Sequence, residues 1–260
     1  MAGKPLKIVI IGSGNVASYF AKTFYAAGAA ILQVYSRKIE NARSLAKAVK
    51  AEATDETGKL LPAADLYLIA VKDDALPGLI QQLKIRKGMV AHTAGSVSMN
   101  VLKKFPQRGV FYPLQTFSKG RRPAAVTLCL EASSKNGFAF LAKAAQSIGA
   151  DVYPLDSAQR RAAHLAAVFA CNFTNHLYEI AAELLEEKKL PFALLRPLIE
   201  ETAAKIKTLS PAEAQTGPAL RGDEAVMQKH LALLEKHPGW EKIYQQLSKD
   251  IQANSRKKNK

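Results

Sequence analysis

Residues 6–17 read LKIVIIGSGNVA, an apolar run that leads directly into a G-x-G-x-x-A pattern. The β-branched run predicts a strand, and apolar residues that recur at helical spacing after it predict a helix. In this setting Gly12 makes the tight turn, Gly14 lets the backbone approach a pyrophosphate, and Ala17 lets the helix lie close to the sheet. The pyrophosphate then sits at the helix N-terminus. The residues expected to bind a dinucleotide here are Gly12, Ser13, Gly14, Asn15 and Val16.

Strand and helix patterns go on alternating after this motif, which predicts a doubly wound, mostly parallel sheet. The run at 66–71 is almost continuously apolar, as in a strand buried on both faces. A last strand at 151–153 is expected at the sheet edge. The fold class is therefore α/β, with an N-terminal Rossmann dinucleotide-binding domain over residues 1–156.

The pattern changes at residue 157, after which no turn signal interrupts the chain as far as residue 188. Apolar residues recur there at helical spacing, so we expect one long helix, followed by further helices. Residues 157–252 are thus expected to form an all-helical domain for dimerisation and substrate binding. Residues 253–260, which are rich in Lys and Arg, are expected to form a basic flexible tail.

The composition excludes several classes of protein. No stretch approaches about 18 uninterrupted apolar residues and no signal-peptide pattern opens the chain, so we expect a cytoplasmic protein without membrane contact. The formal net charge is +15, but the cations are scattered and no nucleic-acid-binding motif accompanies them. We therefore expect no specific nucleic-acid partner. Cys129 and Cys171 are expected to be buried thiols, and the five histidines lack metal-ligand spacing, so no metal is expected.

The choice of cofactor is expected to depend on Ser36, Arg37 and Lys38, which follow the predicted second strand. A carboxylate at this place would bind an unmodified ribose and repel a 2′-phosphate, whereas Ser with Arg offers a hydroxyl and a planar cation to the phosphate. NADP(H) is therefore preferred over NAD(H). The alternative is an ordinary basic helix start, which the helix dipole disfavours.

Two more strands are expected to end at the ligand-binding edge of the sheet. The backbone at Ala70, Val71 and Lys72 is expected to line the cofactor, as are Thr93 and Gly95. Ser96 is expected to bind substrate. Nearby acidic residues at 73 and 74 fit a helix N-cap as well as a catalytic task, and His92 fits either a core residue or a catalyst.

Candidate substrate-binding residues also occur in two polar loops and on the long helix. Gln115 and Thr116 lie in the loop 112–118, and Thr216 and Arg221 lie in the loop 216–223. His164 and Asn172 are eight residues apart on the long helix, which places them on the same broad side about 12 Å apart. They can therefore border one cleft.

Six segments together resemble one known family, the bacterial Rossmann-like proteins that carry a C-terminal domain of unknown function, DUF2520. The resemblance covers essentially the whole chain, and its segments are 12–17, 70–74, 92–96, 112–118, 164–172 and 216–223. These proteins are similar in architecture to the 6-phosphogluconate dehydrogenase-like reductases, including pyrroline-5-carboxylate reductase and ketopantoate reductase. The resemblance implies an NADP-linked reductase whose helical domain helps to build a homodimer.

The resemblance also implies roles for three residues. The better-known ketopantoate reductases use a Lys on the long helix as the acid, and His164 is the nearest polar counterpart in this sequence. Asn172 resembles their substrate-binding Asn. Relatives commonly carry His before the Pro-Leu-Gln-Thr-Phe segment, where this chain has Tyr112, so the proton donor stays open among His164, Tyr112 and His92.

The function predicted from the sequence is an NADP-dependent oxidoreductase that reduces a small carbonyl acid, such as a ketopantoate-like one, or a cyclic imine. His164 and Asn172 are the expected catalytic residues. The alternative is a non-catalytic NADP-binding sensor, because a fold does not by itself determine function.

Overall fold

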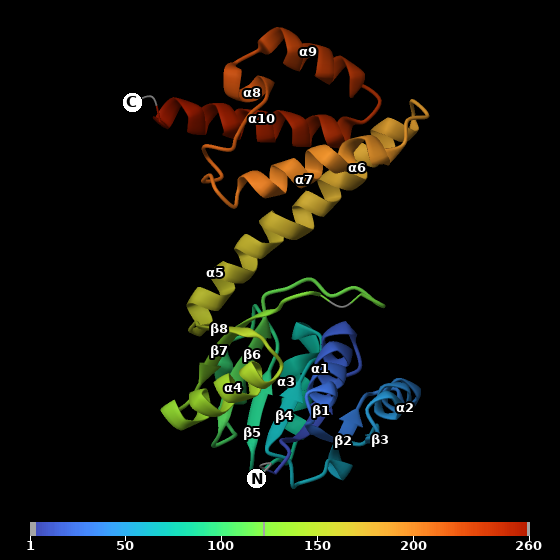
Figure 1. Cartoon of the computed structure of the whole chain (residues 1–260), viewed down its shortest axis with the longest axis vertical. Coiled ribbons are helices and arrows are strands. Elements are labelled where there is room, and N and C mark those ends of the chain that lie inside the picture. Colours follow the sequence, from blue (N-terminus) through green and yellow to red (C-terminus); the bar gives the residue numbers. More distant parts are fainter. Residues whose placement is uncertain (1–3, 122, 259–260) are drawn as a thin grey trace. The chain divides into compact units, whose positions relative to one another are not determined.

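The computed structural model of the protein describes residues 4–121 and 123–258. The chain divides into two compact units, residues 1–172 and 173–260 (Figure 1). The division falls later than the boundary expected at residue 156. The reason is that the first part of the long helix packs on the sheet unit, where the Arg160 side chain is fully buried.

The first unit contains one eight-stranded sheet in the order β3-β2-β1-β4-β5-β6-β7-β8 (Figure 1). All neighbouring strands are parallel except β6 and β7. The predicted α/β class is confirmed, and β8 lies at an edge as expected. The strands are β1 Lys7–Ile11, β2 Ala30–Tyr35, β3 Glu52–Thr54, β4 Leu66–Ile69, β5 Met89–His92, β6 Arg108–Pro113, β7 Thr127–Ala132 and β8 Asp151–Pro154.

Successive side chains of a strand point to opposite faces of the sheet. Both sets are apolar in this sheet and must be buried, so helices cover both faces. Ile8 and Ile10 of β1 belong to the core beneath α1, α2 and α4, whereas Val9 and Ile11 belong to the core beneath α3. The helices of this unit are α1 Asn15–Ala26, α2 Ile39–Ala48, α3 Leu76–Gln82, α4 Lys135–Ser147 and α5 Ser157–Ala167.

The long helix has a π-helical turn at its middle. Asp156 caps α5 through a capping box with Gln159, and α5 continues through a π turn, Val168–Phe173, into α6, Thr174–Glu186. A π turn adds residues to one helical turn and changes which side chains share a face. The one uninterrupted α-helix that the sequence predicts is therefore corrected at this point.

The second unit is helical, as predicted. The remaining helices are α7 Arg196–Lys205, α8 Pro218–Arg221, α9 Glu224–Leu233 and α10 Pro238–Lys258. α8 lies inside the segment expected as a loop, between Gly217 and Gly222, which both have positive φ. α10 makes residues 253–258 helical where a flexible tail was expected, and residues 259–260 lie outside the described residues.

The two cysteines differ in exposure. Cys129 is buried as predicted, but Cys171 is exposed, because residues 169–173 of the long helix all lie on the surface. None of the helices in the described ranges is both long and apolar enough to span a membrane.

Candidate functional site

The turn after β1 requires glycine at its first position. Gly12 has φ +134°, and a Cβ at this residue would lie 2.1 Å from the carbonyl oxygen of Ala70, which follows β4. An L side chain rarely adopts this backbone conformation, and the neighbouring backbone leaves no space for one. The close approach of β1 and β4 thus explains the first glycine of the motif.

The N-terminus of α1 has the space and the donors that a pyrophosphate needs. A Cβ on Gly14 would meet no atom within 4 Å, so open space lies in front of this residue. No side chain caps α1, and its first turn holds no acidic residue. The first N–H groups of a helix lack partners within the helix and attract anions. The residues present therefore fit the pyrophosphate of a dinucleotide.

The end of β2 contacts this loop directly. The hydroxyls of Ser13 and Ser36 are 2.8 Å apart, and Ser36 is buried. Arg37 and Lys38 are exposed, and neither makes an ion pair with another described residue. Both cations remain available to an anionic ligand beside the loop.

The segment after β6 reaches over the start of α1. The Asn15 side-chain amide donates to the Phe117 carbonyl at 3.0 Å, and the rings of Tyr19 and Phe117 are 4.9 Å apart. Gln115 donates to the Ala125 carbonyl at 3.0 Å and accepts from the Thr116 N–H at 2.8 Å. The structure thus places Gln115 and Thr116, expected as substrate-binding residues, in a loop whose own hydrogen bonds use the Gln115 amide.

A groove of about 660 Å³ runs between α1, α2 and this loop. Its charged lining residues are all cations: Lys22, Lys119 and Arg121. The groove also includes Ser13 and Asn15 of residues 12–17, the candidate dinucleotide loop, so it adjoins the candidate cofactor site.

Three segments meet at one point near the ends of β5 and β6. The Tyr112 hydroxyl lies 2.9 Å from His164 Nδ1, and the two rings meet edge to face. A Cβ on Gly95 would lie 2.9 Å from both rings. Gly95 therefore lets the Tyr112–His164 pair approach the end of β5, at the sheet edge where open α/β sheets bind ligands.

Tyr112 is buried, and burial is the largest cause that raises the pKa of its phenol to about 12. The phenol is consequently protonated at neutral pH. It donates to Nδ1 of a neutral His164 ring in the Nε2–H tautomer, and it accepts from Nδ1–H of a charged ring. Nε2–H is then available in both states, and this nitrogen has no hydrogen-bond partner among the residues that the structure describes.

The side chains that follow β4 and β5 bond to one another or to the backbone. Ser96 donates to Asp73 Oδ2, and no side chain caps the helical turn that begins at Asp73. The Thr93 hydroxyl is buried and donates to the Ile69 carbonyl at 3.3 Å. Asp73 is therefore a partner of Ser96 and does not cap the turn.

His92 is a core residue. It is fully buried, its Nδ1 accepts from the Ala94 N–H at 3.1 Å, and burial chiefly lowers its pKa to about 3. The ring is neutral and enclosed at neutral pH. This leaves His164 and Tyr112 as the two candidate proton donors.

The structure does not join the other expected residues to this pair. Asn172 is exposed within the π turn, and no hydrogen bond in the described part of the chain links it to His164. Thr216 and Arg221 belong to the second unit, where Arg221 lies 3.9 Å from Asp223 Oδ2. The roles of these three residues in substrate binding stay predictions.

Arg160 and Glu131 were not among the residues expected at the site. Arg160 Nη1 lies 2.5 Å from Glu131 Oε2, and the arginine side chain is fully buried. Arg160 stands four residues before His164, a spacing that places both on one helix face. That spacing is the sequence signal that could have identified Arg160, and not its exposed neighbour Arg161, as the arginine on the same helix face as His164.

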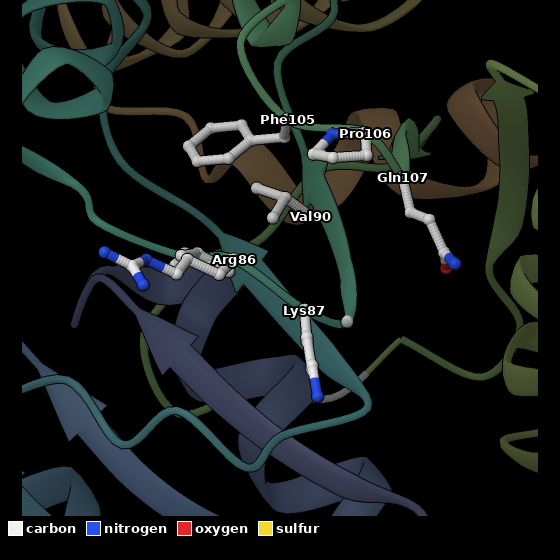
Figure 2. A pocket seen from close by; sticks show the side chains of 8 residues that line it. Arg86, Lys87, Val90, Phe105, Pro106 and Gln107 are labelled. Carbon is white, nitrogen blue, oxygen red and sulfur yellow. The ribbon is translucent and has the colours of Figure 1, made fainter.

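A second cavity lies at the amino ends of the parallel strands, on the side of the sheet opposite to the candidate site. It measures about 310 Å³ and lies where β5 and β6 begin, with Val90 and Phe105 among its walls and Arg86 and Lys87 beside them (Figure 2). Ligands of open α/β sheets bind at the carboxyl ends of the strands, so this cavity is separate from the candidate site. Across the described ranges, no three His, Cys, Asp or Glu side chains gather as a metal site would require.

Comparisons with known proteins agree with this geometry. The family "NADP oxidoreductase coenzyme F420-dependent" matches residues 7–94, and the domain of unknown function DUF2520 matches residues 126–251. A protein of Bacteroides fragilis, provisionally assigned as an NADP oxidoreductase, is 45% identical over 96% of this chain and 98% of its own, with a TM-score of 0.88. No curated protein matches the sequence.

More distant structures share the fold. Pyrroline-5-carboxylate reductase of Streptococcus pyogenes is 15% identical over 96% of this chain and 98% of its own, with a TM-score of 0.66. A reductive aminase of Aspergillus terreus, in complex with NADPH and ethyl-5-oxohexanoate, is 12% identical over 98% and 95%, with a TM-score of 0.76. The identity to the Bacteroides protein over nearly the whole length shows that this chain belongs to the Rossmann-like NADP oxidoreductase family that carries the DUF2520 domain.

Proposed function

We propose that the protein is an NADP(H)-dependent reductase that reduces a C=N or C=O double bond of a small molecule. The observation that carries the proposal is the Tyr112–His164 pair, which lies against Gly95 at the end of β5. The dinucleotide loop follows β1 of the same sheet, so both lie at the carboxyl edge of the first unit.

The proposed chemistry divides between the cofactor and the protein. When bound, the NADPH cofactor would supply the hydride that reduces the sp² carbon of the substrate. The electron pair of the double bond ends on nitrogen or oxygen, and the charged His164 ring gives that atom its proton from Nε2. The ring is then neutral and keeps its other proton on Nδ1, which donates to the Tyr112 oxygen. Tyr112 holds the ring through Nδ1, so Nε2 stays directed toward substrate.

The proposed substrates are a small carbonyl acid, such as a ketopantoate-like one, and a cyclic imine. The names of the structural relatives support this range, because they include imine reductases, a reductive aminase and pyrroline-5-carboxylate reductase. Each of these relatives acts on a carbon that carries a double bond to nitrogen or oxygen.

A turnover screen tests the proposal. Purified protein is mixed with NADPH and a panel of 2-keto acids and cyclic imines, and the loss of NADPH absorbance is followed. We expect consumption with at least one of these two classes. NADPH binding by fluorescence titration without turnover on any member would contradict a reductase of this range and favour a non-catalytic sensor.

The proposed preference for NADPH over NADH is at least tenfold in affinity, which corresponds to about 1.4 kcal/mol. Its basis is the pair of exposed cations Arg37 and Lys38 beside Ser36. Replacing Arg37 with Asp puts a repulsive charge where a pairing one stood, so the preference should disappear or invert.

Fluorescence titration of both cofactors measures this change. Arg43→Asp is the matched control. Arg43 lies on α2 and is exposed, as Arg37 is, and the two substitutions change the charge by the same amount. Equal affinities of the unmodified protein for NADPH and NADH would overturn the proposed preference.

We also propose a homodimer that forms mainly through residues 157–252. The support is a set of exposed apolar side chains in the second unit, since monomeric proteins rarely expose large contiguous apolar patches. They include Leu190, Leu194, Leu198, Ile206, Leu209, Leu233 and Leu247, with exposed fractions from 43% to 70%.

Light scattering at micromolar concentration is expected to give the mass of two chains. Leu198 is 62% exposed on α7, and a Leu198→Asp substitution is expected to weaken assembly by placing a charge in the apolar interface. A monomeric mass for the unmodified protein at this concentration would contradict the proposal.

A further inference from the structure

We infer that the ion pair between the fully buried Arg160 and the partly buried Glu131 is a positioning device that holds His164 against Tyr112. The inference rests on the proposed function, in which the Tyr112–His164 pair directs a proton to substrate. Neither ionic residue touches the place where substrate would react. Both act through the helix that carries His164.

The Arg160 side chain is fully buried and bonds to two neighbouring segments. Nη1 donates to Glu131 Oε2 at 2.5 Å, and Nη2 donates to the Val97 carbonyl at 2.6 Å. Nη2 also donates to the Ser157 hydroxyl at 3.2 Å. One planar fork therefore ties α5 to β7 and to the segment that follows Gly95 and Ser96.

Ser157 completes this network. Its hydroxyl donates to Glu131 Oε2 at 2.8 Å and accepts from the Met99 N–H at 3.0 Å. With the bond from Arg160, the hydroxyl uses its one donor and both of its acceptor positions. The first turn of α5 is consequently fixed at Ser157 and at Arg160.

The same network holds the segments that carry His164, Tyr112 and Gly95. His164 lies one helical turn after Arg160, so fixing Arg160 fixes the height and rotation of the imidazole. In the β6–β7 ladder, Val110 pairs with Glu131 and Tyr112 pairs with Cys129, so Glu131 lies two residues from the partner of Tyr112. Val97 lies two residues after Gly95, where an added Cβ would lie 2.9 Å from both rings.

Only a guanidinium can make all of these bonds at once. Its planar fork reaches a carboxylate, a carbonyl and a hydroxyl in fixed directions, whereas a lysine ammonium is a single point charge on a flexible stem. Arg160→Lys keeps the positive charge and loses the planar fork. The expected consequence is that α5 shifts slightly and the 2.9 Å contact of Tyr112 with His164 lengthens.

Arg160→Lys, Glu131→Gln and Ser157→Ala test the inference in full-length protein, with Arg161→Lys as the matched control on the exposed side of α5. We expect Arg160→Lys to lower kcat about tenfold, with KM and the NADPH Kd within about twofold, since a misplaced catalytic group costs rate and leaves ground-state binding intact. Ser157→Ala removes a single hydroxyl and should give a smaller loss. Arg161→Lys should behave like the unmodified protein.

A second measurement does not depend on turnover. The ¹⁵N chemical shifts of the His164 ring report which nitrogen carries the proton, and the bond to Tyr112 favours Nε2–H in the neutral ring. Arg160→Lys should move these shifts toward those of a free imidazole, as Tyr112→Phe should. If the contact is the route of action, the losses in kcat from Arg160→Lys and Tyr112→Phe will be less than additive.

Folded Arg160→Lys, Glu131→Gln and Ser157→Ala variants with unchanged kcat and unchanged His164 shifts would overturn the inference. A parallel loss of NADPH affinity and kcat in Arg160→Lys would also overturn it, because that result indicates general loosening of the first unit. If the unmodified protein turns over no substrate, the proposed function fails, and the His164 shifts still decide whether Arg160 positions the ring.

Discussion

Turnover is expected to fall about 100-fold when His164 is replaced with alanine, while NADPH affinity changes by no more than about a factor of two. Nε2 of this residue is the nitrogen left available once Tyr112 occupies Nδ1. Removing it takes away a proton donor that acts mainly in the transition state. The dinucleotide loop lies at the ends of other strands, so cofactor binding should persist.

His176→Ala is the matched control, because His176 is an exposed histidine on α6 that pairs only with Glu179 in the described structure. Tyr112→Phe should give a smaller loss than His164→Ala, since it removes the group that orients the ring and keeps the ring itself. Steady-state kinetics on the best substrate of the screen measure all three variants. Unchanged turnover in His164→Ala would remove this residue from the mechanism and leave Tyr112 as the donor.

Gly12→Ala is expected to lower the free energy of unfolding by about 2 to 5 kcal/mol, from backbone strain and from overpacking together. Its φ of +134° is unfavourable for alanine, and the added Cβ would lie 2.1 Å from the Ala70 carbonyl oxygen. Either the β1 turn or β4 must move to admit it. Cofactor binding should be lost with the turn.

Gly14→Ala separates the two roles of the motif. A Cβ there meets no protein atom within 4 Å, so the unfolding midpoint should stay near that of the unmodified protein. The methyl group would occupy space in front of the α1 N-terminus, so NADPH affinity should fall. Thermal unfolding and fluorescence titration of both variants check this pair, and full NADPH affinity in Gly14→Ala would contradict the proposed pyrophosphate position.

The local sequence predicted the parts of this protein that depend on local physics. Strand periodicity, helical spacing and the motif at 12–17 were enough for the α/β class and for a helical second unit. The structural reason for Gly12 also agrees with the motif, because a tight turn out of a strand beside a neighbouring strand needs a residue without a Cβ. The helix start at Ser157 follows from the capping box that Asp156 and Gln159 form.

Only the tertiary structure decided which polar residues meet. Tyr112 and His164 are 52 residues apart in the chain, and Arg160 and Glu131 are 29 apart. Such contacts depend on strand order and on how α5 packs against β7, which no local period encodes. The π turn that contains Asn172 is likewise a departure from regular helical spacing that the sequence did not predict. The sequence by itself therefore determined the architecture and the glycine turn after β1, because those rest on short-range sterics and periodicity. The tertiary structure decided the Tyr112–His164 pair and its buried anchor, because those rest on long-range packing.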